Sequence, residues 1–112
     1  MPYYTDKQKR VRKIASLKRG NPDAILREIY EWEPAITQTE KEYVEVWDEL
    51  GMIQDGNRRV SQSEHEDLIE YKLELASELN DLYESLSMNI GITVNSREDL
   101  EKVMKQQVNR LD

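Results

Sequence analysis

The stretch 61-SQSEHEDLIEYKLELASELNDLYESLSM-88 decides the fold, because it is the longest uninterrupted helical pattern in the chain. Ser61 and Ser63 each stand three residues before a glutamate, which is the spacing of a capping box at a helix N-terminus. No Gly or Pro follows before Gly91. We therefore predict one long central helix over about residues 63–88.

This helix has two different sides when its residues are placed at 100° intervals. The apolar side holds Leu68, Ile69, Tyr71, Leu75, Ala76, Leu79, Leu82, Tyr83 and Leu86. The opposite side is an acidic face that includes Glu66, Glu70, Glu74, Glu78, Asp81 and Glu84. The apolar side requires a core or a partner, whereas the acidic face is typical of a solvated surface.

The predicted helix interface is a line of leucines with one lysine in it: Leu68, Lys72, Leu75, Leu79, Leu82 and Leu86. The leucines follow heptad spacing over about three repeats, so they fit either a homodimer through the long helix or the core of a monomeric bundle. A lysine that is buried without a partner is costly. Lys72 is therefore expected to extend its amine to solvent or to meet an acid from another element.

The whole sequence predicts a single all-α domain over residues 1–112. The chain has no cysteine, no apolar run that approaches a membrane span and no hydrophobic secretory segment at its N-terminus. We expect a cytoplasmic protein without membrane contact.

The net charge of −7 is unevenly distributed. Residues 1–20 hold seven Lys or Arg and one Asp, a net charge of +6, whereas residues 23–84 hold eighteen acids and five bases, a net charge of −13. Such asymmetry indicates that the two regions face different partners or each other.

The basic region 1–20 is expected to contain an amphipathic helix from about residue 6 to residue 18. Val11, Ile14, Ala15 and Leu17 gather on one side, while Lys9, Arg12 and Lys13 lie opposite, with Arg19 at the rim; these four basic residues are candidates for contact with nucleic acid or an acidic partner. The alternative is that the helix docks on the acidic body of its own fold or of a dimer mate.

Residues 21–60 predict a pair of helices followed by a turn or a hairpin. Asn21 and Pro22 begin a helix that Pro34 is expected to end, and a third helix, opened by Thr37, is expected to stop at Gly51. Residues 52–60 read as a short β-hairpin or a plain loop.

Residues 61–112 hold the long helix and a C-terminal helix. The segment 90–94 alternates apolar and small residues as a strand does, and Ser96 with Asp99 opens the last helix. This gives about five helices in all.

No catalytic or metal-binding pattern is present. His65 is the one histidine, the glycines are scattered, and carboxylates one turn apart, such as Glu66 and Glu70, lie on the polar side of a helix rather than in a desolvated pocket. We expect no enzymatic activity, no cofactor and no metal.

Three functions fit these observations. The first is a non-enzymatic helical interaction or regulatory protein whose partner is another protein or a second copy of the chain. The second follows from a resemblance: 50-LGMI-53, then 55-DGNRRV-60 and a long helix, look like the end of the recognition helix and the wing of winged-helix repressors. That resemblance implies a DNA-binding transcriptional regulator, in which the bases are approached by Thr37, Gln38, Thr39, Lys41 and Tyr43 and the DNA backbone by Arg58 and Arg59.

The third function interprets the acidic face as a mimic of nucleic acid. Carboxylates spaced one turn apart on a rigid helix imitate a row of phosphates, so the protein would occupy the nucleic-acid groove of an enzyme and inhibit it. Small acidic helical proteins of this kind resemble products that phages make against host machinery.

Overall fold

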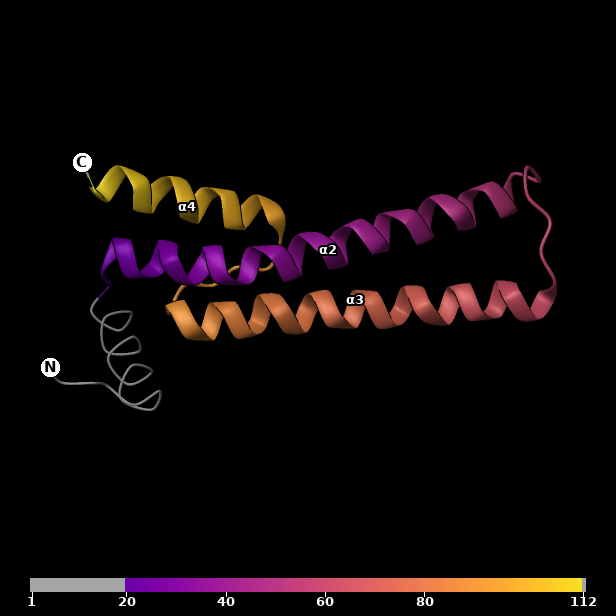
Figure 1. Ribbon diagram of the computed structural model, residues 1–112, viewed down its shortest axis with the longest axis horizontal. Coiled ribbons are helices and arrows are strands. Elements are labelled where there is room, and N and C mark those ends of the chain that lie inside the picture. Colours follow the sequence, from indigo (N-terminus) through magenta and orange to yellow (C-terminus); the bar gives the residue numbers. More distant parts are fainter. Residues whose placement is uncertain (1–19, 112) are drawn as a thin grey trace, which may run out of the picture. The chain divides into compact units, whose positions relative to one another are not determined.

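The structure of the protein is a computed structural model that describes residues 20–111; the helix expected at residues 6–18 lies outside them. Within this range the chain forms three helices, α2 (Pro22–Gln54), α3 (Gln62–Ile90) and α4 (Arg97–Leu111), and no strand (Figure 1). The predicted all-α class is confirmed. The sequence predicts four helices within this range and the structure has three, and the possible hairpin at 52–60 is not formed.

Helix α2 is continuous where the sequence predicts two helices separated at Pro34. An interior proline removes one backbone hydrogen bond, here to the carbonyl of Tyr30, and costs about 3 kcal/mol. Pro34 and Tyr30 lie on the exposed side of α2, so water can solvate the released carbonyl. Ile29 and Ile36, which flank the proline, are fully buried, and burying each contributes roughly 2 kcal/mol. Packing on both sides therefore offsets the cost of the proline.

Helix α2 continues through Gly51, ends at Gln54 and is closed by Gly56. The Gly56 N–H donates to the Ile53 carbonyl at 3.2 Å, and the Asn57 N–H donates to the Met52 carbonyl at 2.9 Å. Gly56 has a φ of 78°. These features define a Schellman motif, in which a left-handed glycine closes a helix. The Asp-Gly pair that predicts a hairpin turn is therefore a helix cap.

Helix α3 confirms the predicted long helix. The Ser61 hydroxyl accepts a hydrogen bond from the Glu64 N–H at 3.1 Å, as an N-cap does. At the other end Gly91 has a φ of 72° and donates its N–H to the Ser87 carbonyl at 2.9 Å. A left-handed glycine again closes the helix.

The segment that follows α3 is held by a side chain and is not a strand. The Ser87 hydroxyl accepts the Val94 N–H at 2.8 Å and lies within donating distance of the carbonyls of Val94 and Tyr83, at 2.9 and 2.7 Å. Val94 is fully buried. Helix α4 then begins as predicted, with the Ser96 hydroxyl accepting the Asp99 N–H at 3.2 Å.

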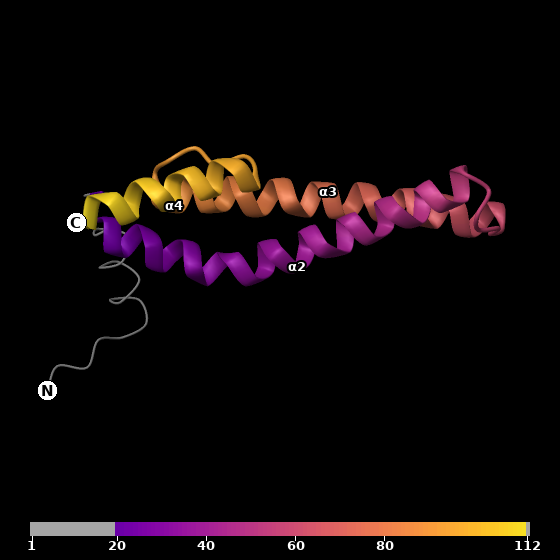
Figure 2. The same cartoon turned by 90° about the horizontal axis from the view of Figure 1, so that it is seen from above.

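The described residues form two compact units. Unit 1 contains residues 20–33 and 83–111, in which α4 lies antiparallel to the first part of α2 (Figures 1 and 2). Arg97 reaches Glu33 at 3.5 Å, and Arg110 donates to the Gly20 carbonyl at 2.7 Å. The buried hydrophobic residues of unit 1 are Ile25, Leu26, Ile29, Tyr83, Leu86, Ile90, Val94, Leu100 and Val103.

Unit 2 contains residues 34–82, an antiparallel pair formed by the second part of α2 and the first part of α3. Its buried side chains are few: Ile36, Thr39, Val46 and Leu75. The Thr39 hydroxyl donates to the Ala35 carbonyl at 2.8 Å, so this buried polar group is satisfied within its own helix. A two-helix unit of this kind leaves large side chains partly exposed on both of its flanks.

None of the helices between residues 20 and 111 has a stretch that is long and apolar enough to cross a membrane.

Candidate functional site

Two side-chain contacts fix the register of the helix pair in unit 2. The Lys72 ammonium lies 3.8 Å from the centroid of the Trp47 ring, and the Tyr71 hydroxyl hydrogen-bonds to the Glu42 carboxylate. At 100° per residue, Trp47 and Lys72 lie to one side of the buried line, and Glu42 and Tyr71 lie to the other. Unit 2 therefore presents two chemically different flanks.

The apolar flank consists of Val44 and Trp47 from α2 and Ile69 and Leu73 from α3. Their exposed fractions are 55%, 50%, 40% and 64%. Because the helices are antiparallel and Trp47 faces Lys72, Val44 lies level with Leu75, and the four residues fall within about 9 Å along the helix axis. They form an apolar band across the flank, in which Val44 and Leu73 are turned toward the outer sides of their helices. Exposed apolar residues that share one flank mark interaction sites more often than scattered ones do.

Trp47 is held in place although half of it is exposed. The edge of its ring meets Tyr43 in a T-shaped arrangement, with centroids 6.4 Å apart and an interplanar angle of 73°. Lys72 covers the ring from α3 and gains a cation–π contact. Lys72 therefore meets an aromatic ring, which differs from the expected acid or solvent. An aromatic side chain fixed on two sides is a rigid anchor for a partner.

Acidic residues border the apolar flank. Glu40 lies one turn before Val44 on the same side of α2, and Asp48 and Glu66 lie toward the outer edges of the two helices. Residues 34–82 together carry thirteen acids and four bases, a net charge of −9. A partner of this flank must therefore offer apolar side chains in a positively charged setting.

The acidic flank gathers around Tyr71 and consists of Glu42, Tyr71, Glu74 and Glu78. Partial burial of the ring, the charge and hydrogen bond of Glu42, and the charges of Glu78 and Glu74 raise the pKa of Tyr71 above its ordinary value of 10.0. The ionised phenolate is disfavoured first by desolvation and then by the negative charges of the three carboxylates. Carboxylates from two helices thus produce one region of negative potential.

The residues of the predicted helix interface are divided between the two units. They face neighbouring residues of the same chain and not the surface. Leu75 in unit 2 and Leu86 in unit 1 are buried, while Leu68, Lys72, Leu79 and Leu82 are partly buried. The buried leucines pack against other residues of the same chain, so they are not available to a second copy. The apolar residues of α3 that remain exposed in unit 2 include Ile69 and Leu73.

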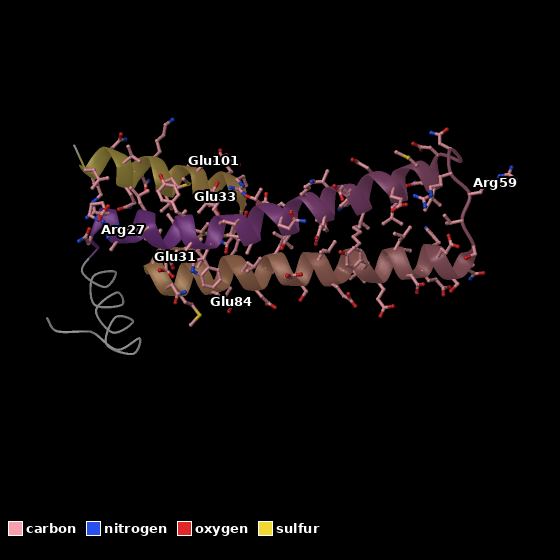
Figure 3. All side chains as sticks on the ribbon, viewed as in Figure 1. Arg27, Glu31, Glu33, Arg59, Glu84 and Glu101 are labelled. Carbon is pink, nitrogen blue, oxygen red and sulfur yellow. The ribbon has the colours of Figure 1, made fainter. Side chains whose placement is uncertain are left out.

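The predicted acidic face is exposed at every position. Glu66, Glu70, Glu74, Glu78 and Asp81 belong to unit 2. Glu84 belongs to unit 1, where it points away from α2 and α4 (Figure 3). The row is therefore continuous on the helix but shared by two units.

The predicted basic contacts do not converge in the part of the chain that the structure describes. Lys9, Arg12, Lys13 and Arg19 lie outside it. Arg58 forms a salt bridge with Glu49 of the same unit. Arg59 projects outward from the connection between α2 and α3 (Figure 3). Arg58 and Arg59 therefore do not lie on the hairpin that the resemblance implies.

No group of three or more His, Cys, Asp or Glu side chains among residues 20–111 is arranged to hold a metal ion.

The apolar flank does not follow from the periodicity of the sequence alone, although the sequence contains a signal for it. The pattern places Ile69 and Tyr71 on the same apolar side of α3, yet they are two residues apart and so point about 160° away from each other. One neighbouring helix cannot bury both. A side as broad as this one predicts exposed apolar residues at its edges, as the structure shows for both residues. Likewise, Tyr43, Val46, Trp47 and Leu50 stand at positions i, i+3, i+4 and i+7 of the sequence, a spacing that predicts a buried face for Trp47.

A comparison with family models, curated proteins and solved structures finds no match to this chain.

Proposed function

We propose that this chain is a non-enzymatic interaction module that binds a protein partner through the apolar flank of unit 2. The observation that carries the proposal is that Val44, Trp47, Ile69 and Leu73, which share this flank, are each at least 40% exposed. These residues offer a rigid aromatic anchor and branched side chains whose burial would stabilise a complex. The acidic border limits the choice of partner to basic surfaces.

The test compares bait proteins that differ only in the apolar flank. The full chain is immobilised and exposed to an extract of its native host, and the retained proteins are identified by mass spectrometry. Leu73→Glu introduces a charge at the most exposed residue of the flank and should weaken partner retention by about tenfold or more, as at an interface hot spot. The control is Met88→Glu, because Met88 is an exposed apolar residue of the same helix that lies in unit 1.

The proposal requires that one protein is retained by the unmodified chain and by the Met88 variant but lost with the Leu73 variant. Equal retention by all three baits would show that the flank is not the binding surface. Circular dichroism of each bait checks that the helices are intact. Both substituted side chains are largely exposed, so neither change removes core packing.

The acidic flank favours a second candidate, a mimic that occupies the nucleic-acid groove of an enzyme. Glu42, Glu74 and Glu78 come from two helices, and all three carboxylates contribute, after desolvation, to the raised pKa of Tyr71. The same extract experiment separates this candidate from the first. A bait with these three residues changed to Gln should lose a nucleic-acid enzyme that the Leu73 variant retains.

The resemblance to winged-helix repressors depends on a wing at residues 55–60. Residues 52–54 are the end of α2, and Gly56 belongs to a helix cap, so the predicted wing is absent from the described chain. The supposed recognition helix is the second part of α2, where Glu40, Glu42 and Glu45 would repel phosphates.

A further inference from the structure

We propose that the partner of the apolar flank is the basic N-terminal segment, residues 1–19, of a second copy of this chain. The inference rests on the proposed function, because it names an occupant for the same flank. Two copies exchange their N-terminal segments, and each segment covers the band formed by Val44, Trp47, Ile69 and Leu73 of the other copy.

Charge selects this occupant over a direct contact between two apolar flanks. Unit 2 carries a net charge of −9, so two such units placed face to face repel each other. Residues 1–19 carry seven basic residues and one acid, a net charge of +6. The most basic part of the chain is therefore complementary to its most acidic unit.

The apolar residues of the segment match the band. Val11, Ile14 and Leu17 recur every three residues, so a helical segment presents them on one side, with Lys9 and Arg12 on the other. Packing of the apolar side of an amphipathic helix against an apolar surface of a partner is a common recognition mode. Lys9 and Arg12 then lie on the solvent side of the segment, and their positive charge complements the acidic border of the flank, which includes Asp48 and Glu66.

The point where the segment leaves the described chain is fixed in unit 1. Gly20 follows the segment directly, and its carbonyl accepts a hydrogen bond from Arg110 at 2.7 Å. The segment thus begins from a defined place on one copy. When two copies exchange their segments, each flank is covered by the segment of the other copy, which gives a closed dimer with two-fold symmetry. No uncovered flank is then left to bind a further copy and promote fibres.

The experiment measures the mass of the full-length chain by analytical ultracentrifugation over a range of concentrations. The unmodified chain should be a dimer that weakens as salt rises, because surface charges are screened beyond about 10 Å at 0.1 M salt. The tail variant K9E/R12E/K13E and the flank variant Leu73→Glu should each weaken the dimer by about tenfold or more. Met88→Glu, which adds the same charge outside the flank, should leave the dimer unchanged.

Mixing the two defective variants gives the decisive result. The tail variant retains an intact flank, and the flank variant retains an intact tail, so one of the two contacts can form between them. The mixture should therefore contain more one-to-one heterodimer than either variant alone forms homodimer at the same total concentration. A contact between two flanks cannot give this result, because the tail variant would then dimerise by itself.

A monomeric unmodified chain, an unweakened dimer of the tail variant, or a mixture without heterodimer each overturns the inference. Duplex DNA at low salt is a parallel probe: if the tail variant loses DNA binding while its dimer is unchanged, the segment serves nucleic acid and the inference fails. If a host protein is retained through Leu73 while the chain is monomeric, this inference fails and the proposed function stands.

Discussion

The Ser87 hydroxyl connects helix α3 to the segment that follows it. It accepts the N–H of Val94 at 2.8 Å, and Val94 is fully buried. A buried N–H that loses its partner costs about 1–3 kcal/mol. Ser87→Ala should therefore lower the free energy of unfolding by about 1–3 kcal/mol, measured by urea denaturation followed by circular dichroism.

Ser77→Ala is the matched control for this change. Ser77 lies on the same helix but is exposed, so its replacement should leave stability unchanged or raise it by about 0.5 kcal/mol through helix propensity. An equal effect of both substitutions would contradict the assigned role of Ser87. The hydroxyl also explains why residues 90–94 need no strand partner, which the alternation of their side chains alone does not reveal.

Only some residues of the candidate site can be predicted from the sequence. The carboxylates of the acidic face can be identified from the sequence because charged side chains are rarely buried. Periodicity assigns Trp47, Ile69 and Tyr71 to buried faces because it reports which side of a helix a residue occupies. How much of that side a neighbour covers depends on the number of helices packed there, and unit 2 has only two.

At the scale of whole elements, the two glycines near the end of α2 have opposite roles. Gly51 lies inside the helix, and an added Cβ would meet nothing within 4 Å. Gly56 has a φ of 78°, which L side chains rarely adopt. Gly51→Ala should raise the free energy of unfolding by about 0.5–1 kcal/mol, because glycine has the greater freedom to lose on folding.

Gly56→Ala should lower the free energy of unfolding by about 1–2 kcal/mol, because a residue with a Cβ is strained in the left-handed conformation. Thermal denaturation of the two variants and of the unmodified chain shows whether each substitution raises or lowers the stability. If α2 instead ended at Gly51 and 52–60 formed a hairpin, Gly51→Ala would be the damaging change. A stabilising Gly51→Ala together with a destabilising Gly56→Ala is thus specific to the Schellman cap.

Helix starts are more predictable than helix ends in this chain. The N-caps at Asn21, Ser61 and Ser96 can be recognised because a capping side chain and its backbone partners lie within three residues of each other. The expected stop at Pro34 is wrong because continuation of the helix is decided by burial of Ile29 and Ile36. Such tertiary packing is not encoded in the local pattern.

At the scale of the whole molecule, the two units differ in how much apolar surface they bury. Nine hydrophobic residues are buried in unit 1, whereas the buried hydrophobic residues of unit 2 are Ile36, Val46 and Leu75. Regions with few buried apolar contacts open most readily. Unit 2 should therefore undergo local opening more often than unit 1.

Native-state hydrogen exchange tests this difference directly. The amides of Val46 and Leu75 should exchange about tenfold or more faster than those of Ile29 and Leu86, after correction for intrinsic rates. All four lie within helices, so secondary structure is matched. Equal protection at the four positions would mean that both units open together as one cooperative structure.

The two tryptophans of the chain fall one in each unit, in unlike surroundings. In unit 1 the Trp32 indole donates to the Glu28 carboxylate at 2.8 Å, whereas in unit 2 the half-exposed Trp47 ring lies beneath the Lys72 ammonium. A chain that retains only one of them would report by its fluorescence on one unit alone. The molecule thus contains its own pair of optical probes, and the probe in unit 2 lies where a partner is proposed to bind.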